Sequence, residues 1–138
     1  PLAQALPDDD LAMPMPTNGE IDPRWRETFA DAAREWLTAI DDDEVLLLGL
    51  RIRYRLSQRE VAQLLSVHEG TISRRTDQLR DQCVQSLARQ LTEAGWTGDD
   101  LFELIRTEMI SLLLDSPRLS VDSLAQILAK KGKRAPNA

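Results

Sequence analysis

From residue 23 onward, apolar residues recur at intervals of three or four positions, which is the spacing of one face of an α-helix. No segment shows the sustained alternation of Val, Ile and Thr that is typical of a β-strand. The predicted fold class is therefore all-α. The pattern predicts helices over about 23–40, 45–54, 57–65, 69–91, 99–114 and 121–130.

Changes in composition divide the chain into four parts. We expect a flexible Pro-rich acidic linker, a main helical domain, a C-terminal helical extension and a basic tail, at residues 1–21, 22–95, 96–130 and 131–138. Asp22 followed by Pro23 is typical of an N-cap with proline at the first helical position. The acidic run 41–44 is typical of a helix start, and His68 and Ser120 are expected to cap the helices that follow them. Because the chain begins at Pro1 rather than at Met, we expect it to be a fragment of a longer protein.

The segment from residue 57 to 91 carries the most specific pattern. Ser57 and Glu60 have the spacing of a capping box, in which each side chain satisfies the other residue's backbone amide at a helix start. Residues 66–68 interrupt this helix after about two turns, and a longer helix follows. A short helix, a tight turn and a long helix predict a helix-turn-helix, with the small Ala62 at the helix crossing and Val67 pinning the turn to the core.

In a helix-turn-helix bound to DNA, the second helix enters the major groove and the first lies across the backbone. The candidates for contact with bases are therefore the side chains early in the second helix that packing does not use: Glu69, Gly70, Ser73, Arg74, Arg75 and Gln78. An arginine can donate two hydrogen bonds to guanine, and a glutamate can accept one from cytosine. The candidates for contact with phosphates are Arg51, Arg53, Arg55, Ser57, Arg59, His68, Thr71 and Arg80.

The distribution of charge favours one DNA-binding segment, although the formal net charge of the chain is −6. Residues 1–44 hold twelve Asp and Glu against three Arg, whereas residues 51–90 hold eight Arg against four acidic residues. Association with phosphates depends on the face that is presented to them, so an acidic whole does not exclude a basic face. We expect DNA to meet residues 51–80 only.

Composition also excludes several classes of function. No apolar run approaches the roughly 20 residues that span a bilayer, and no signal peptide opens the chain, so we expect a cytoplasmic protein without a membrane partner. One cysteine, Cys83, and one histidine, His68, cannot form a disulfide or a metal cluster. Cys83 falls on the apolar stripe of the long helix and is expected in the core. Without a catalytic constellation, we expect neither an enzyme nor a cofactor.

The segment Leu56–Arg75 resembles the DNA-binding half of region 4 of bacterial RNA polymerase sigma factors, especially extracytoplasmic-function and related alternative sigma factors. The shared features are the Leu-Ser start, Val-Ala after three residues, the apolar turn residue, and Thr-Ile followed by basic positions. The similarity covers about residues 37–91 and includes the apolar helix upstream. Arg55 and Ser66 stand where the family commonly has glycine, and Thr76 stands where a larger apolar residue is usual.

The resemblance implies a promoter-recognition domain that contacts the minus-35 element with its second helix. It also implies docking on the flap of the polymerase β subunit through an apolar groove, and it admits an anti-sigma protein or another regulator as a further partner. Two alternatives to a sigma factor remain open, because a helix-turn-helix occurs in all three kinds of protein. One is an autonomous transcription regulator that dimerises through residues 99–130 on a palindromic site, and the other is a recombinase or a module that binds only polymerase or an anti-sigma protein.

Overall fold

The structure, a computed structural model, describes residues 23–136, and all regular structure in that range is helical, as predicted. The elements are α1 (Pro23–Ala39), α2 (Asp42–Leu48), the π-helix η2 (Gly49–Arg53), α3 (Gln58–Leu65), α4 (Glu69–Glu93), α5 (Leu101–Leu114), the 3-10 turn η3 (Pro117–Leu119) and α6 (Val121–Lys130). The predicted linker 1–21 and the Asp22 cap lie outside the described residues.

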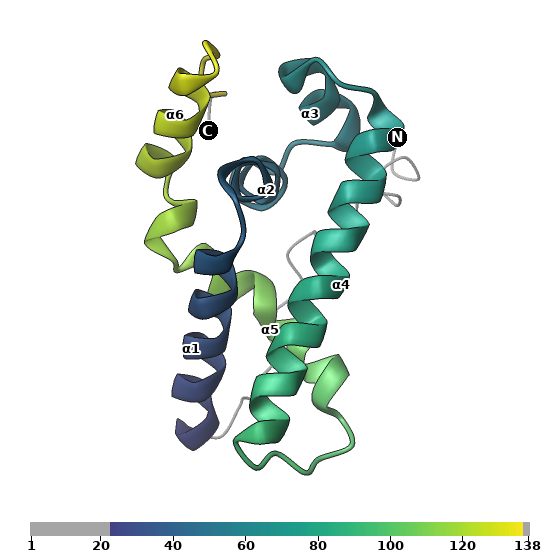
Figure 1. The fold of residues 1–138 in the computed structure, drawn as a ribbon, viewed down its shortest axis with the longest axis vertical. Coiled ribbons are helices and arrows are strands. Elements are labelled where there is room, and N and C mark those ends of the chain that lie inside the picture. The colour runs from purple at the N-terminus through teal and green to yellow at the C-terminus, as the bar shows by residue number, and fades with distance from the viewer. Residues whose placement is uncertain (1–22, 137–138) are drawn as a thin grey trace.

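The long helix α4 connects two groups of helices (Figure 1). In the lower part of the view α1, α4 and α5 pack on one another, and in the upper part α2 lies between α6 and the start of α4, against which α3 packs. One hydrophobic core runs through both groups and receives buried side chains from α1 to α6. Cys83 belongs to this core, as predicted, and burial raises the pKa of its thiol to about 12.

The second helix differs from its prediction. Its start is confirmed: the Asp41 side chain accepts from the Glu44 amide at 2.9 Å, and the Glu44 carboxylate accepts from the Asp41 amide at 3.0 Å. The α-helix does not continue to Tyr54, however, because the backbone widens into a π-helix at Gly49. A Cβ at Gly49 would lie 2.4 Å from both Cδ atoms of Leu124, so the glycine lets α6 approach the backbone closely.

The C-terminal extension is fastened to the corner between α1 and α2. The Arg118 guanidinium donates to the carbonyl oxygens of Leu37, in the last turn of α1, and of Ile40, just after it, and to the Asp42 carboxylate at 3.1 Å. These bonds satisfy carbonyls that have no partner within their own helix. The predicted cap of the last helix is confirmed, since the Ser120 hydroxyl accepts from the Ser123 amide. The extension therefore shares its core and its hydrogen bonds with the main domain.

The turn between α3 and α4 has the geometry that its sequence predicts. Ser57 and Glu60 form the expected capping box, with 3.1 Å from the Glu60 amide to the Ser57 hydroxyl and 2.9 Å from the Ser57 amide to the Glu60 carboxylate. Ser66 ends α3 in the left-handed conformation, at φ 59° and ψ 44°. Arg55 adopts the same positive φ before α3. These are the two positions at which the sigma-factor resemblance leads one to expect glycine.

We predict that Ser66→Gly raises the free energy of unfolding by about 0.5–1 kcal/mol. A residue with a Cβ is strained by roughly 1–2 kcal/mol in the left-handed region, whereas glycine is not, and the larger unfolded-state entropy of glycine offsets part of that gain. Urea unfolding followed by circular dichroism measures the difference. Ser66→Ala keeps the Cβ and should gain nothing, and equal stability of the two variants would contradict the strain argument.

Candidate nucleic-acid interface

The six residues predicted to contact bases all lie in the first three turns of α4. Glu69, Arg74, Arg75 and Gln78 are exposed, and Gly70 and Ser73 are half-buried. His68 precedes them as the N-cap that the sequence predicts, because its Nδ1 accepts from the Gly70 amide at 2.9 Å. Since Nδ1 is an acceptor, the neutral ring carries its proton on Nε2, which can donate to an external acceptor.

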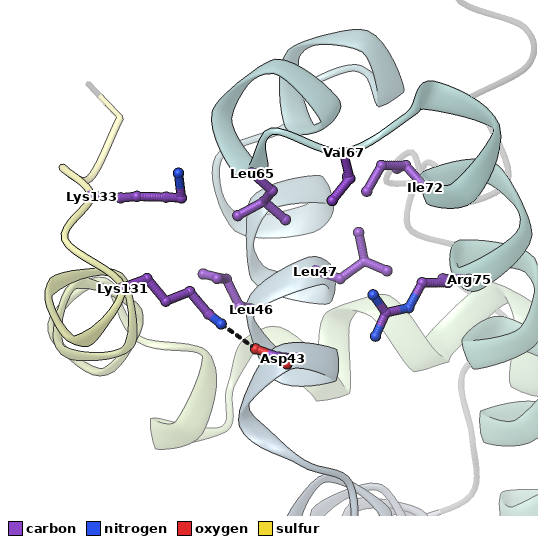
Figure 2. Close-up of a pocket in the computed structure, with 9 residues that line it drawn as sticks. All are labelled: Asp43, Leu46, Leu47, Leu65, Val67, Ile72, Arg75, Lys131 and Lys133. Carbon is purple, nitrogen blue, oxygen red and sulfur yellow. Dashed lines mark ion pairs between the residues drawn. The ribbon is translucent and has the colours of Figure 1, made fainter.

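Two adjacent arginines of α4 lie on different sides of the helix. The Arg74 guanidinium extends toward the first turn, where its Nη1 would lie 3.9 Å from a Cβ built on Gly70. Arg75 instead faces α2 and lines a groove beside Leu47 (Figure 2). Neither forms a hydrogen bond or an ion pair with the described residues. Both guanidinium groups are therefore available, but only Arg74 lies over the start of α4.

Two of the predicted phosphate contacts do not fit the structure. Arg51 is buried, with an exposed fraction of 6%, and its Nη1 donates to the Leu56 carbonyl at 2.6 Å. Arg53 is half-buried, and its guanidinium donates to the carbonyl oxygens of Leu114 and Leu119. Both side chains hold the π-helix to its neighbours, so neither is presented to a DNA phosphate.

Five of the other predicted phosphate contacts lie around the turn, and the sixth, Arg80, lies about three turns further along α4. Arg55 and Arg59 are exposed, and Arg59 forms a loose ion pair with Glu69 of α4, at 3.8 Å from Nε to the carboxylate. Arg80 pairs with Asp77 and Asp81 on its own helix, at 3.4 Å and 3.5 Å. The last three, Ser57, His68 and Thr71, sit at the starts of α3 and α4. The starts of both helices therefore lie beside cationic side chains.

The structure also contains an apolar groove whose position the sequence did not predict. It encloses about 430 Å³ between α2, the turn and the residues after α6, and its lining residues are Asp43, Leu46, Leu47, Leu65, Val67, Ile72, Arg75, Lys131 and Lys133. Val67 was expected to be pinned to the core, but 40% of its surface is exposed, because its side chain faces this groove. The sequence signals were the apolar groove that the sigma-factor resemblance implies and the unbroken apolar run Val45–Leu48, two of whose residues line the groove.

Within residues 23–136 there is no group of three or more side chains suited to hold a metal ion. No helix in the same range has both the length and the apolar character that a bilayer crossing requires. Comparisons of the chain with models of protein families, with curated sequences and with solved structures gave no match.

Proposed function

We propose that residues 57–93 form a DNA-binding helix-turn-helix and that the chain is the promoter-recognition domain of a sigma factor, acting in the cytoplasm with RNA polymerase. The observation that carries this proposal is the polar start of α4, directly after a tight turn. Glu69, Arg74 and Gln78 are exposed there and are not used for packing. A helix of this kind fits the major groove, where its exposed side chains can bind the edges of bases.

The distribution of charge also supports an orientation in which the start of α4 faces the DNA. The amide ends of α3 and α4 carry the positive ends of two helix dipoles, and both helices begin at this surface. Arg55, Arg59 and Arg74 add exposed cationic groups around them. DNA phosphates on either side of the major groove would therefore meet partial and full positive charges, which fix the register of the helix without reading sequence.

The packing of the C-terminal helices favours the sigma factor over the dimeric regulator. A regulator that dimerises through residues 99–130 needs an uncovered apolar face on these helices. Instead most apolar residues of α5 and α6 are buried in the core of their own chain, including Ile105, Met109 and Leu124, and the two exposed ones, Phe102 and Val121, lie on different helices. The resemblance over residues 37–91, together with this internal packing, is the basis for choosing the sigma-factor function.

Selection from a random DNA library tests the DNA-binding part of the proposal. The 138-residue chain is immobilised, bound duplexes are amplified over several rounds, and the dissociation constant for the enriched sequence is compared with that for a scrambled duplex at a fixed salt concentration. We expect the enriched duplex to bind at least about 10³-fold more tightly. Absence of enrichment, or equal affinity for both duplexes, would rule out sequence-specific DNA binding.

A second measurement separates the sigma factor from the regulator. The chain is mixed with the isolated flap of the polymerase β subunit, and its mass in solution is determined alone and in the mixture. The proposal expects a monomer that binds the flap. A stable dimer that does not bind the flap would favour the autonomous regulator instead.

A further inference from the structure

An apolar groove lies open between the turn and the end of α6. Its accessible apolar side chains are Val67, which is 40% exposed, and the partly buried Leu65, whereas Leu46, Leu47 and Ile72 beneath them are only 1–3% exposed. The floor consists of five apolar side chains that meet from α2, α3, the turn and α4 (Figure 2), namely Leu46, Leu47, Leu65, Val67 and Ile72. Its volume of about 430 Å³ is within the usual range of ligand pockets. Burying such a surface is favourable, so the groove is suited to take apolar side chains.

The rim of this groove is cationic. Arg75 lies on one side, and Lys131 and Lys133 lie on the other. The single acidic residue of the rim, Asp43, is already paired with Lys131 at 2.5 Å from Oδ1 to Nζ. Arg75 and Lys133 have no ion pair with any residue in the range 23–136. An occupant that combines apolar side chains with carboxylates would therefore match both the floor and the rim.

The part of the chain outside the described residues contains a segment with this chemistry. Residues 8–15 read Asp-Asp-Asp-Leu-Ala-Met-Pro-Met. Pro14 and the following Pro16 disfavour a helix here, and in an extended backbone Leu11, Met13 and Met15 would share one face. We propose that residues 8–15 dock in the groove, with Leu11 and Met13 on its apolar floor and the three aspartates at its cationic rim.

The connection is long enough to run the whole length of α1. Helix α1 has 17 residues and is about 25 Å long, and α2, which supplies one wall of the groove, begins three residues after it. Leu11 lies twelve residues before Pro23 and Met15 lies eight before it, so an extended chain spans up to roughly 26–43 Å. An extended segment can therefore run back along the whole of α1 toward the groove.

This docking does not rest on the proposed DNA binding. It would place carboxylates beside Arg75, on the flank of the helix that we propose to enter the major groove. The chain would then carry an acidic segment of its own next to its candidate DNA-binding surface.

Thiol labelling of Val67→Cys in the full 138-residue chain tests the docking. The native Cys83 does not interfere, because it is 1% exposed and its raised pKa keeps it protonated. A tethered segment has an effective concentration in the millimolar range, so an intrinsic affinity of about 0.1–1 mM gives roughly two- to tenfold protection. We expect Leu11→Ser/Met13→Ser to raise the labelling rate of Val67→Cys by this factor, with Asp8→Asn/Asp9→Asn/Asp10→Asn acting in the same direction.

Val121→Cys is the matched control, because Val121 is 45% exposed, close to the 40% of Val67, and does not line the groove. Its labelling rate should not change with Leu11→Ser/Met13→Ser. The proposal is overturned if Val67→Cys labels at the same rate in both backgrounds, or if both cysteines accelerate equally. Protection that survives the double substitution and grows with protein concentration would instead identify a second copy of the chain as the occupant.

Discussion

Arg74→Ala is expected to weaken binding to the selected duplex by about 1–3 kcal/mol, which is roughly a 5- to 150-fold rise in the dissociation constant. The Arg74 guanidinium lies over the first turn of α4, and it forms no ion pair with the described residues that would compete for it. Two parallel hydrogen bonds to guanine are lost when this side chain is truncated. Fluorescence anisotropy with labelled duplexes at constant salt measures the effect.

Two arginines on the same helix serve as controls for this prediction. Arg75 faces the groove beside α2, so Arg75→Ala should cost less and should weaken selected and scrambled duplexes to a similar degree. Arg89 is exposed at the far end of α4, and Arg89→Ala should leave both affinities unchanged within error. Equal losses from Arg74→Ala on both duplexes would show that Arg74 binds a phosphate rather than a base.

Much of the fold could be predicted because its determinants are local in the sequence. The acidic helix start at residues 41–44, the capping box at Ser57 and the cap at Ser120 each depend on residues close together in the sequence, and each is confirmed. The π-helix at Gly49 could not be predicted in this way. Its periodicity hardly differs from that of an α-helix over five residues, and the side chain that packs against Gly49 comes from Leu124, far along the chain.

The candidate site, too, has features that follow from the local sequence and features that depend on tertiary contacts. Its position early in α4 follows from the cap and the turn, which the sequence contains. The roles of individual arginines do not, because Arg53 is bound by carbonyl groups more than sixty residues further along the chain. Arg74 and Arg75 are adjacent in sequence, yet a step of about 100° around the helix places them in different surroundings. Only the tertiary structure shows which one faces α2.

Leu124→Ala is expected to lower the free energy of unfolding by about 2–5 kcal/mol. Leu124 is fully buried in α6, at 0% exposure, and its truncation leaves a cavity against the π-helix. A loss of this size requires that the extension folds with the main domain as one unit. Urea unfolding followed by tryptophan fluorescence measures it, because Trp25 and Trp36 lie in α1 and Trp96 follows α4, so none of the three lies in α6. A second unfolding transition that leaves the tryptophan fluorescence unchanged would contradict this expectation.

Substitution of Gly49, which packs against Leu124, makes the test of this contact more specific. Gly49→Ala alone should cost about 1–3 kcal/mol, because the new methyl group would lie 2.4 Å from the Leu124 side chain. In the Leu124→Ala background that methyl group enters the vacated space, and alanine is favoured over glycine in a helix by roughly 0.5–1 kcal/mol. The same substitution should then be neutral or stabilising, so its effect reverses between the two backgrounds. Additive losses in the double variant would show that Gly49 and Leu124 are not in contact, and that the docking of α6 on the π-helix is different from the one described.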